Sequence, residues 1–186
     1  MILYHGSPER GLAVLKPSVS PFFGKPKQVC LAALRPMALL YGIRHFEYTY
    51  GFSDGRLVYE EYFPEAAEEL YGGKPASLYL CAQRDGMEET SIPYEFVSGT
   101  EVPVEEEIFI PDLYAALLEE ERSGNIQIVQ WTALSENGRE WVRRMEMQEI
   151  LENRLLAEPD SPRARYMREK YPESWAMARK EMEDGR

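Results

Sequence analysis

Cysteine and histidine are scarce in this sequence, with two residues of each type among 186. Cys30 and Cys81 do not form a C-x-x-C pair, and His5 and His45 are 40 positions apart, so no spacing typical of a zinc site is present. We therefore expect no metal cofactor. Two cysteines in a chain of this length are typical of a reducing compartment, where both serve as small buried apolar side chains.

Long apolar runs are also missing. The first residues, Met1-Ile2-Leu3-Tyr4-His5, have neither the basic start nor the long apolar core of a signal peptide. No stretch approaches the ~18 uncharged apolar residues that would span a bilayer. These absences predict a cytoplasmic protein with no membrane partner.

Basic residues are in deficit. The chain has 21 Lys and Arg residues against 32 Asp and Glu residues, which gives a formal net charge of −11. A chain this acidic is repelled by phosphate backbones, which argues against a nucleic-acid partner. Arg139, Arg143 and Arg144 form the only basic cluster before the C-terminal tail. The mixture of both charges with 12% aromatic residues indicates a folded chain.

Local patterns predict strands first and helices at the end of the chain, which is an α+β layout. Asp54-Gly55 lies between two aromatic-rich segments and predicts a β-hairpin. Pro36 and Pro111 can occupy the first turns of helices, where the missing N–H costs nothing. The expected strands are residues 2–5, 29–33, 46–52, 56–62, 76–82, 94–97, 102–110 and 126–131; the expected helices are residues 36–41, 64–70 and 111–122, with a turn or short helix at 11–15.

The character of the sequence changes after Ser135. Residues 136–157 are expected to be helical, and Ser161 with Pro162 predicts the start of one final helix. We therefore divide the chain into a domain of residues 1–134 and a helical C-terminal extension of residues 135–186. The extension either packs back on the domain as a cover or presents Met167, Trp175 and Met177 to a partner chain, which leaves an oligomer open.

His5 is the first candidate functional residue. It stands at the end of a strand, directly before Gly6-Ser7, where backbone amides are free to meet a ligand. The alternative is a histidine whose hydrogen bonds are satisfied within the sheet. A third reading pairs Cys30 with His5 as nucleophile and base, but an acidic chain offers little of the positive potential that a thiolate requires.

Four further segments follow the His5-Gly6-Ser7 strand in a fixed order. They are Gly11-Leu12-Ala13-Val14-Leu15, Val29-Cys30-Leu31-Ala32, Ala38-Leu39-Leu40-Tyr41 and Pro93-Tyr94-Glu95-Phe96-Val97. This set resembles the ADP-ribosyltransferase superfamily, in particular the branch of the poly(ADP-ribose) polymerases and diphtheria toxin. That branch has a His-Gly-Ser or His-Gly-Thr strand, a strand with a Tyr, a helix whose Tyr follows eleven residues later, and a Glu at the start of a late strand. The distance from Cys30 to Tyr41 is also eleven residues.

The resemblance implies a fold of split mixed or antiparallel β-sheets with flanking helices, and NAD⁺ as the substrate. It implies ADP-ribosyl transfer from NAD⁺ to a macromolecule, or NAD⁺ hydrolysis, in a cleft where His5, Tyr41 and Glu95 converge. Gly6 would bind the nicotinamide amide through its backbone, His5 the adenosine-side ribose, Tyr41 the nicotinamide ring and Glu95 the 2′-hydroxyl of the nicotinamide ribose. The implied catalytic residues are Glu95 and His5, and the implied NAD⁺-binding residues are Tyr4, His5, Gly6, Ser7, Cys30, Ala38 and Tyr41.

The chain departs from the family pattern at two positions. Cys30 stands where the family has the strand Tyr, and Ala38 stands where it has a Ser that binds the carboxamide. Tyr4, Phe22 or Phe23 could supply the missing ring. The alternative function is a catalytically inactive relative that serves as a binding or interaction module. Other carboxylates near the expected site, second to Glu95, are Glu60, Glu61, Glu101, Glu105, Glu106 and Glu107.

Overall fold

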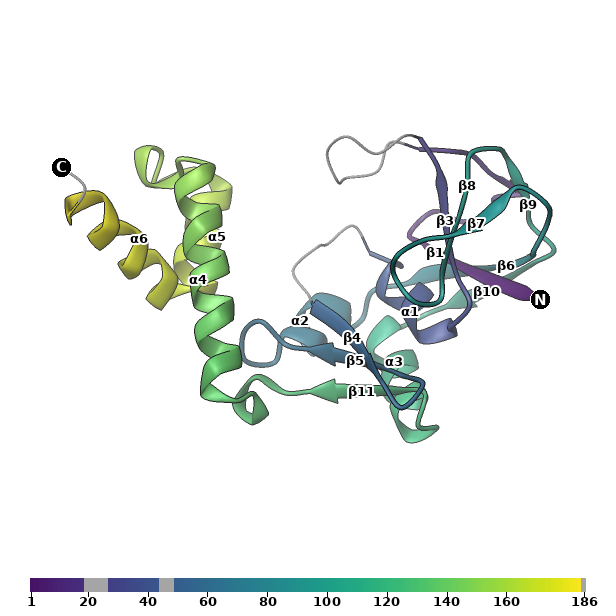
Figure 1. Ribbon diagram of the computed structural model, residues 1–186, viewed down its shortest axis with the longest axis horizontal. Helices are drawn as coiled ribbons and strands as arrows, with labels where there is room; N and C mark the ends of the chain where they lie inside the picture. The colour runs from purple at the N-terminus through teal and green to yellow at the C-terminus, as the bar shows by residue number, and fades with distance from the viewer. Residues whose placement is uncertain (19–26, 44–48, 185–186) are drawn as a thin grey trace. The chain divides into compact units, whose positions relative to one another are not determined.

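A computed structural model of the protein describes residues 1–18, 27–43 and 49–184. It is a mixed α and β structure, as predicted (Figure 1). The chain forms two compact units: Met1–Tyr59 with Ala67–Ile128, and Glu60–Ala66 with Val129–Arg186. The division at 128/129 lies close to the boundary expected at 134/135. Residues 60–66 fall in the first domain expected from the sequence, but in the structure they pack with the second unit.

A six-stranded antiparallel sheet forms the centre of the first unit. Its strand order is β10-β6-β1-β3-β8-β7 (Figure 1). β1 therefore lies inside the sheet, between β6 and β3. The strands are β1 (Ile2–Ser7), β3 (Val29–Ala32), β6 (Ala76–Ala82), β7 (Met87–Glu89), β8 (Glu95–Ser98) and β10 (Glu106–Ile110). The short strand β7 was not expected from the sequence.

The two faces of this sheet have different surroundings. Successive residues of a strand point to opposite faces, and residues paired across strands share one face. Tyr4, Gly6 and Cys30 lie on one side, which we call the helix face because helix α1 (Arg35–Leu40) packs there. Leu3 and His5 lie on the other, which we call the ribbon face.

Helices α1 and α3 (Leu113–Arg122) pack together beside the sheet, and α2 (Ala66–Tyr71) joins them through a hydrogen bond from Tyr71 Oη to the Leu40 carbonyl at 3.2 Å. The carboxylate of Glu120 on α3 is buried between two donors. It forms an ion pair with Arg35, and Asn125 Nδ2 donates to it at 2.7 Å. A buried carboxylate needs such partners, so this pair fixes α3 to the start of α1.

The ribbon face is covered by a two-stranded ribbon of β2 (Val14–Leu15) and β9 (Val102–Pro103). Leu15 and Val102 pack with Leu3, Leu31 and other sheet residues in one apolar cluster. The prediction of a turn or short helix at residues 11–15 was therefore wrong. The single strand expected at 102–110 is also two strands, β9 and β10, because residues 102–103 pair with the ribbon and residues 106–110 pair with β6.

The predicted hairpin is present as β4 (Thr49–Ser53) and β5 (Arg56–Glu60). Asp54 and Gly55 at its tip have φ angles of 52° and 76°, the left-handed conformation that a two-residue hairpin turn requires. β11 (Ile126–Val129) completes a three-stranded sheet in the order β11-β5-β4.

The second unit is helical, with Tyr62 and Phe63 of its early segment against Trp141 and Tyr171. Its helices are α4 (Glu136–Glu152), α5 (Pro162–Lys170) and α6 (Pro172–Asp184), with 3₁₀ turns η1 (Trp131–Ala133) and η2 (Leu155–Ala157). Ser161 caps α5 as predicted, and its Oγ accepts a hydrogen bond from Ala164 N.

The C-terminal helices differ from the prediction in two ways. The helix expected at residues 136–157 ends at Glu152, since Arg154 has a φ of 53° and starts the η2 turn. The single final helix is two helices, α5 and α6, because Tyr171 precedes Pro172. A residue before proline is forced out of the helical region, and Tyr171 has φ −125° and ψ 58°. Met167 and Trp175 are buried within this unit.

Candidate functional site

One row of side chains crosses three strands of the helix face. Tyr4 on β1 pairs with Ala32 on β3, and Ala32 pairs in turn with Glu95, the first residue of β8. Paired residues point to the same side of a sheet. The structure therefore places Glu95 on the helix face with Tyr4 and Gly6, and Cys30 lies on the same face one row further along.

Glu95 is a buried carboxylate, with 6% of its surface exposed. Its Oε2 accepts a hydrogen bond of 2.7 Å from Thr90 Oγ1. Tyr94, directly before it, has a left-handed φ of 66°, and its carbonyl accepts from Ala33 N at 2.8 Å. This local conformation begins strand β8 at Glu95 and holds the Glu95 side chain on the helix face.

Two tyrosine hydroxyls meet at the junction of helix α1 and strand β4. Tyr41 Oη and Tyr50 Oη are 2.6 Å apart, and their rings are edge-to-face, with centroids 6.4 Å apart and planes at 85°. Burial raises the pKa of Tyr50, the hydrogen bond with Tyr41 opposes that rise, and the negative charges of Glu95 and Cys30 add to it. Tyr50 therefore contacts Tyr41 directly, and its pKa responds to the charges of Glu95 and Cys30.

Further aromatic rings extend this pair of tyrosines along the hairpin strand β4. The Phe52 ring lies 6.0 Å from the Tyr50 ring and 5.2 Å from the Tyr94 ring, measured between centroids. Tyr41, Tyr50 and Phe52 are each partly exposed. We call Tyr41, Tyr50, Phe52, Tyr94 and Glu95 the tyrosine–glutamate cluster.

His5 lies on the opposite side of the sheet. It pairs with Tyr79 on β6, and the two rings are 6.4 Å apart on the ribbon face. Its Nδ1 donates to the Cys30 carbonyl at 2.8 Å, which fixes the tautomer because a carbonyl only accepts. Burial lowers the pKa of His5, and this hydrogen bond opposes the shift. The structure therefore places Glu95 on the helix face and the His5 ring on the ribbon face, and Tyr41 is linked to Tyr94, next to Glu95, through the rings of Tyr50 and Phe52.

Gly6, Ser7, Cys30 and Ala38, four of the other expected NAD⁺-binding residues, make contacts within this fold. Ala38 has no exposed surface, and its carbonyl lies so close to Gly6 that a Cβ on Gly6 would be 1.8 Å from the oxygen. Ser7 points to the ribbon face, where its Oγ accepts from Glu9 N at 3.1 Å. Cys30 offers its carbonyl, not its thiol, to His5, so no nucleophile–base pair forms between them.

Tyr50 is a site residue that the sequence does not indicate. The sequence predicts only a strand at residues 46–52, and the contacts of Tyr50 with Tyr41 and Phe52 follow from the packing of the hairpin. Phe22 and Phe23, which were considered as replacements for the missing ring, lie outside the described residues. Among the second-line carboxylates, Glu61 belongs to the second unit and accepts from Trp131 N at 2.9 Å.

No grouping of three or more His, Cys, Asp or Glu side chains suited to a metal ion occurs in residues 1–18, 27–43 and 49–184. Across the same residues, no helix combines the length and the apolar character needed to cross a bilayer. The chain matches no known protein-family model, no curated protein and no solved structure.

Proposed function

We propose that the protein binds NAD⁺ at the tyrosine–glutamate cluster and cleaves its nicotinamide–ribose bond, transferring ADP-ribose to a macromolecule or to water. The observation that carries this proposal is Glu95, a buried carboxylate that accepts a hydrogen bond from Thr90, on a strand whose preceding residue, Tyr94, packs against the ring of Phe52. The ordered resemblance of residues 3–97 to the ADP-ribosyltransferases supports the same reading.

The chemistry requires a negative group beside a sugar. When the bond between ribose C1′ and the nicotinamide nitrogen breaks, nicotinamide leaves with the electron pair and the ribose takes on oxocarbenium character. A fixed carboxylate stabilises that developing positive charge without having to reorganise. The acceptor oxygen or nitrogen then bonds to C1′ and loses its proton. Glu95 is the residue that we assign to the charge-stabilising role.

Tyr50 could supply the aromatic ring that is missing at the position of Cys30. The ring that the family places at the position of Cys30 is missing here, and Tyr50 lies within electrostatic reach of that cysteine. Tyr41 and Tyr50 meet edge-to-face, so a flat nicotinamide ring would stack on one tyrosine and meet the edge of the other. We assign the two rings to the nicotinamide subsite.

A second function, an inactive binding module, is favoured by a specific pair of observations. The His5 ring points away from Glu95, and Ala38 is fully buried under Gly6. Two of the residues that would recognise NAD⁺ in the family are therefore committed to packing. Turnover of NAD⁺ separates the two functions, because a binding module can retain a ligand without cleaving it.

Binding is tested by calorimetry and by thermal unfolding with NAD⁺ and with nicotinamide. A ligand at 100 times its Kd stabilises a protein by about 2.7 kcal/mol, which for a chain of this size is a shift in Tm of roughly 5–10 °C. A shift of this size with NAD⁺ at about 5 mM corresponds to a Kd near 50 μM. No heat and no shift at that concentration would refute the proposal.

Catalysis is tested with Glu95→Gln, which keeps the shape and the acceptor that Thr90 binds. Release of nicotinamide should fall by about 100-fold or more, as for loss of a charge-stabilising group, while the Kd for NAD⁺ changes little. Glu89→Gln is the matched control, because Glu89 is an exposed carboxylate on the neighbouring strand β7. Equal turnover in Glu95→Gln and Glu89→Gln would remove Glu95 from the catalytic role.

A further inference from the structure

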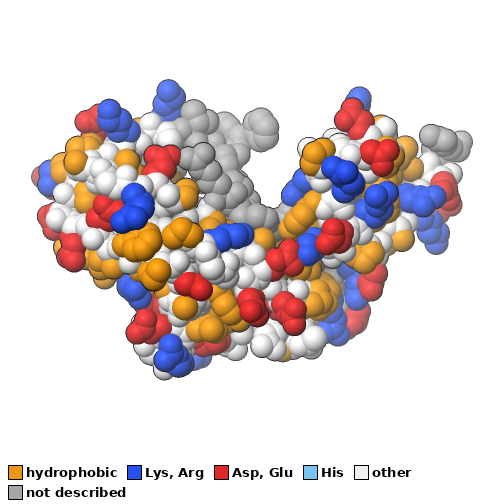
Figure 2. Space-filling view, turned by 180° about the vertical axis from the view of Figure 1, so that it is seen from behind, with side chains coloured by type: hydrophobic (Ala, Val, Ile, Leu, Met, Phe, Trp, Pro, Cys, Tyr) orange, Lys and Arg blue, Asp and Glu red, His pale blue; other side chains and the backbone are white. Residues whose placement is uncertain are grey.

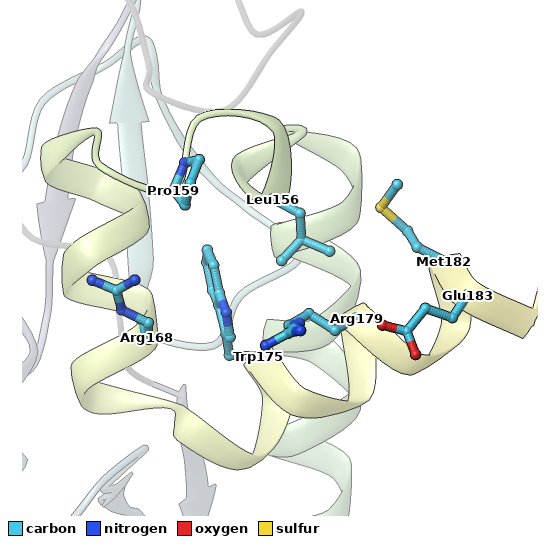
Figure 3. Close-up of a pocket in the computed structure, with 7 residues that line it drawn as sticks. All are labelled: Leu156, Pro159, Arg168, Trp175, Arg179, Met182 and Glu183. Atoms are coloured by element: carbon cyan, nitrogen blue, oxygen red, sulfur yellow. The ribbon is translucent and has the colours of Figure 1, made fainter.

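A pocket of about 450 Å³ lies within the second unit, apart from the tyrosine–glutamate cluster. Its volume is in the range typical of small-molecule sites. It is formed by the η2 turn, helix α5 and helix α6 (Figure 3). The lining residues are Leu156, Pro159, Arg168, Trp175, Arg179, Met182 and Glu183. We call this site the arginine pocket.

Two helices bring arginines to this pocket from different sides. Figure 3 shows the Trp175 ring between Arg168 on α5 and Arg179 on α6. Trp175, Arg179 and Met182 follow one another at positions i, i+4 and i+7, so they share one face of α6. The spacing on α6 therefore directs a guanidinium and two apolar side chains into the same space.

Among the described residues, neither guanidinium group of the pocket is paired with a carboxylate, although Glu183 lies in the same lining. Within the described ranges, neither Arg168 nor Arg179 forms an ion pair, and both side chains are exposed. By contrast, Arg139, Arg143 and Arg163 of the same unit each bind a glutamate. In a chain of net charge −11, two arginines in one pocket without an ion pair to a described residue are not explained by a shortage of carboxylates.

The remaining walls of the pocket are apolar. Leu156 and Pro159 line it from the η2 turn and the residue stretch that follows, and Met182 lines it from α6. Trp175 is 92% buried, so only a small part of its ring faces the pocket and no open face is left for a ligand to stack on. Figure 2 shows Lys and Arg side chains beside hydrophobic ones, with Asp and Glu side chains among them, on the surface of the C-terminal helices.

We propose that the arginine pocket binds a small organic anion, with its carboxylate or phosphate between Arg168 and Arg179 and its apolar body against Leu156, Pro159 and Met182. Guanidinium groups donate paired, charge-assisted hydrogen bonds to both kinds of oxyanion. Glu183 at the edge of the pocket adds one negative charge. The site therefore favours a ligand with one or two charges over a polyanion such as nucleic acid.

The test titrates the full chain by calorimetry with four probes. 4-Phenylbutyrate and phenyl phosphate carry the two candidate oxyanions on an apolar body. 4-Phenylbutyramide lacks the charge, and inorganic phosphate lacks the apolar part. We expect one of the two aryl anions to bind with a Kd of about 1 mM or tighter, and each of the two control probes to bind at least tenfold more weakly, since tenfold is about 1.4 kcal/mol.

Variants locate the binding. Arg168→Gln and Arg179→Gln should each weaken the bound aryl anion by about 10- to 100-fold, the range for a lost charge-assisted hydrogen bond. Arg165→Gln on α5 and Lys180→Gln on α6 remove the same charge from exposed positions outside the lining and should change the Kd by less than about twofold.

Three outcomes would overturn the proposal: no binding of either aryl anion up to about 10 mM, equal binding of the neutral amide, or equal losses in the four variants. Glu95→Gln should leave this binding unchanged, because Glu95 belongs to the first unit and the pocket to the second. A failure of this proposal is therefore distinguishable from a failure of the proposed NAD⁺ chemistry.

Discussion

Replacing Gly6 by alanine tests the closest backbone approach described in this protein. A Cβ at position 6 would lie 1.8 Å from the Ala38 carbonyl oxygen, 2.9 Å from its carbon and 3.0 Å from Gly42 N. All three are backbone atoms, so no side-chain rotation relieves the contact. Helix α1 must move away from β1 by more than 1 Å to restore an ordinary contact of ~3.2 Å or more between the Cβ and the oxygen.

The expected cost of Gly6→Ala is therefore at the upper end of overpacking, about 3 kcal/mol. For a chain of this length, that corresponds to a fall in Tm of roughly 6–12 °C. Differential scanning calorimetry and urea unfolding monitored by circular dichroism would measure it. Gly99→Ala is the matched control, since no atom lies within 4 Å of its added Cβ and its φ is not positive. If Gly6→Ala unfolds within about 1 °C of Gly99→Ala, the described packing of α1 on β1 is wrong.

Two further predictions concern titratable groups. Burial raises the pKa of Cys81 to about 11, and the charge of Glu105 adds to the rise. At pH 8, iodoacetamide should therefore alkylate Cys81 only after the protein unfolds. Rapid labelling of the native protein that is lost in Cys81→Ser would contradict this. Burial lowers the pKa of His5 in the fold, so the unfolded chain binds more protons and stability should fall as the pH drops from about 7 through the folded-state pKa. Urea midpoints between pH 7 and pH 5 should decline less in His5→Gln than in the parent, and parallel curves would show that His5 does not carry this dependence.

Local signals identified much of the fold from the sequence. The expected strand at residues 76–82 has the same bounds as β6. The apolar run there predicts a strand, and the residues directly before and after the run are enough to predict its ends. The Asp54-Gly55 turn was predictable for the same reason. The β2–β9 ribbon was not predictable, since residues 14–15 pair with two residues nearly ninety positions later in the chain. Such a short non-local pairing leaves no periodic pattern in either segment.

The candidate site was only partly predictable. Glu95 and Tyr41 were found through ordered motifs, and the structure places both in the tyrosine–glutamate cluster. The position of the His5 ring could have been anticipated from alternation, because a strand that points Tyr4 and Gly6 to one face points His5 to the other. The role of Tyr50 could not be anticipated, since its contact with Tyr41 depends on how the β4–β5 hairpin packs against helix α1.

The assignment of Glu60–Ala66 to the second unit has a consequence for how the protein can be divided. Neither unit is a continuous stretch of chain, so a single cut at residue 128 does not separate them. The N-terminal fragment would carry Tyr62 and Phe63 without Trp141 and Tyr171, their aromatic partners. During synthesis, the early segment must therefore wait for the last helices to emerge before its own packing is complete, and an excised C-terminal fragment lacks part of its interior.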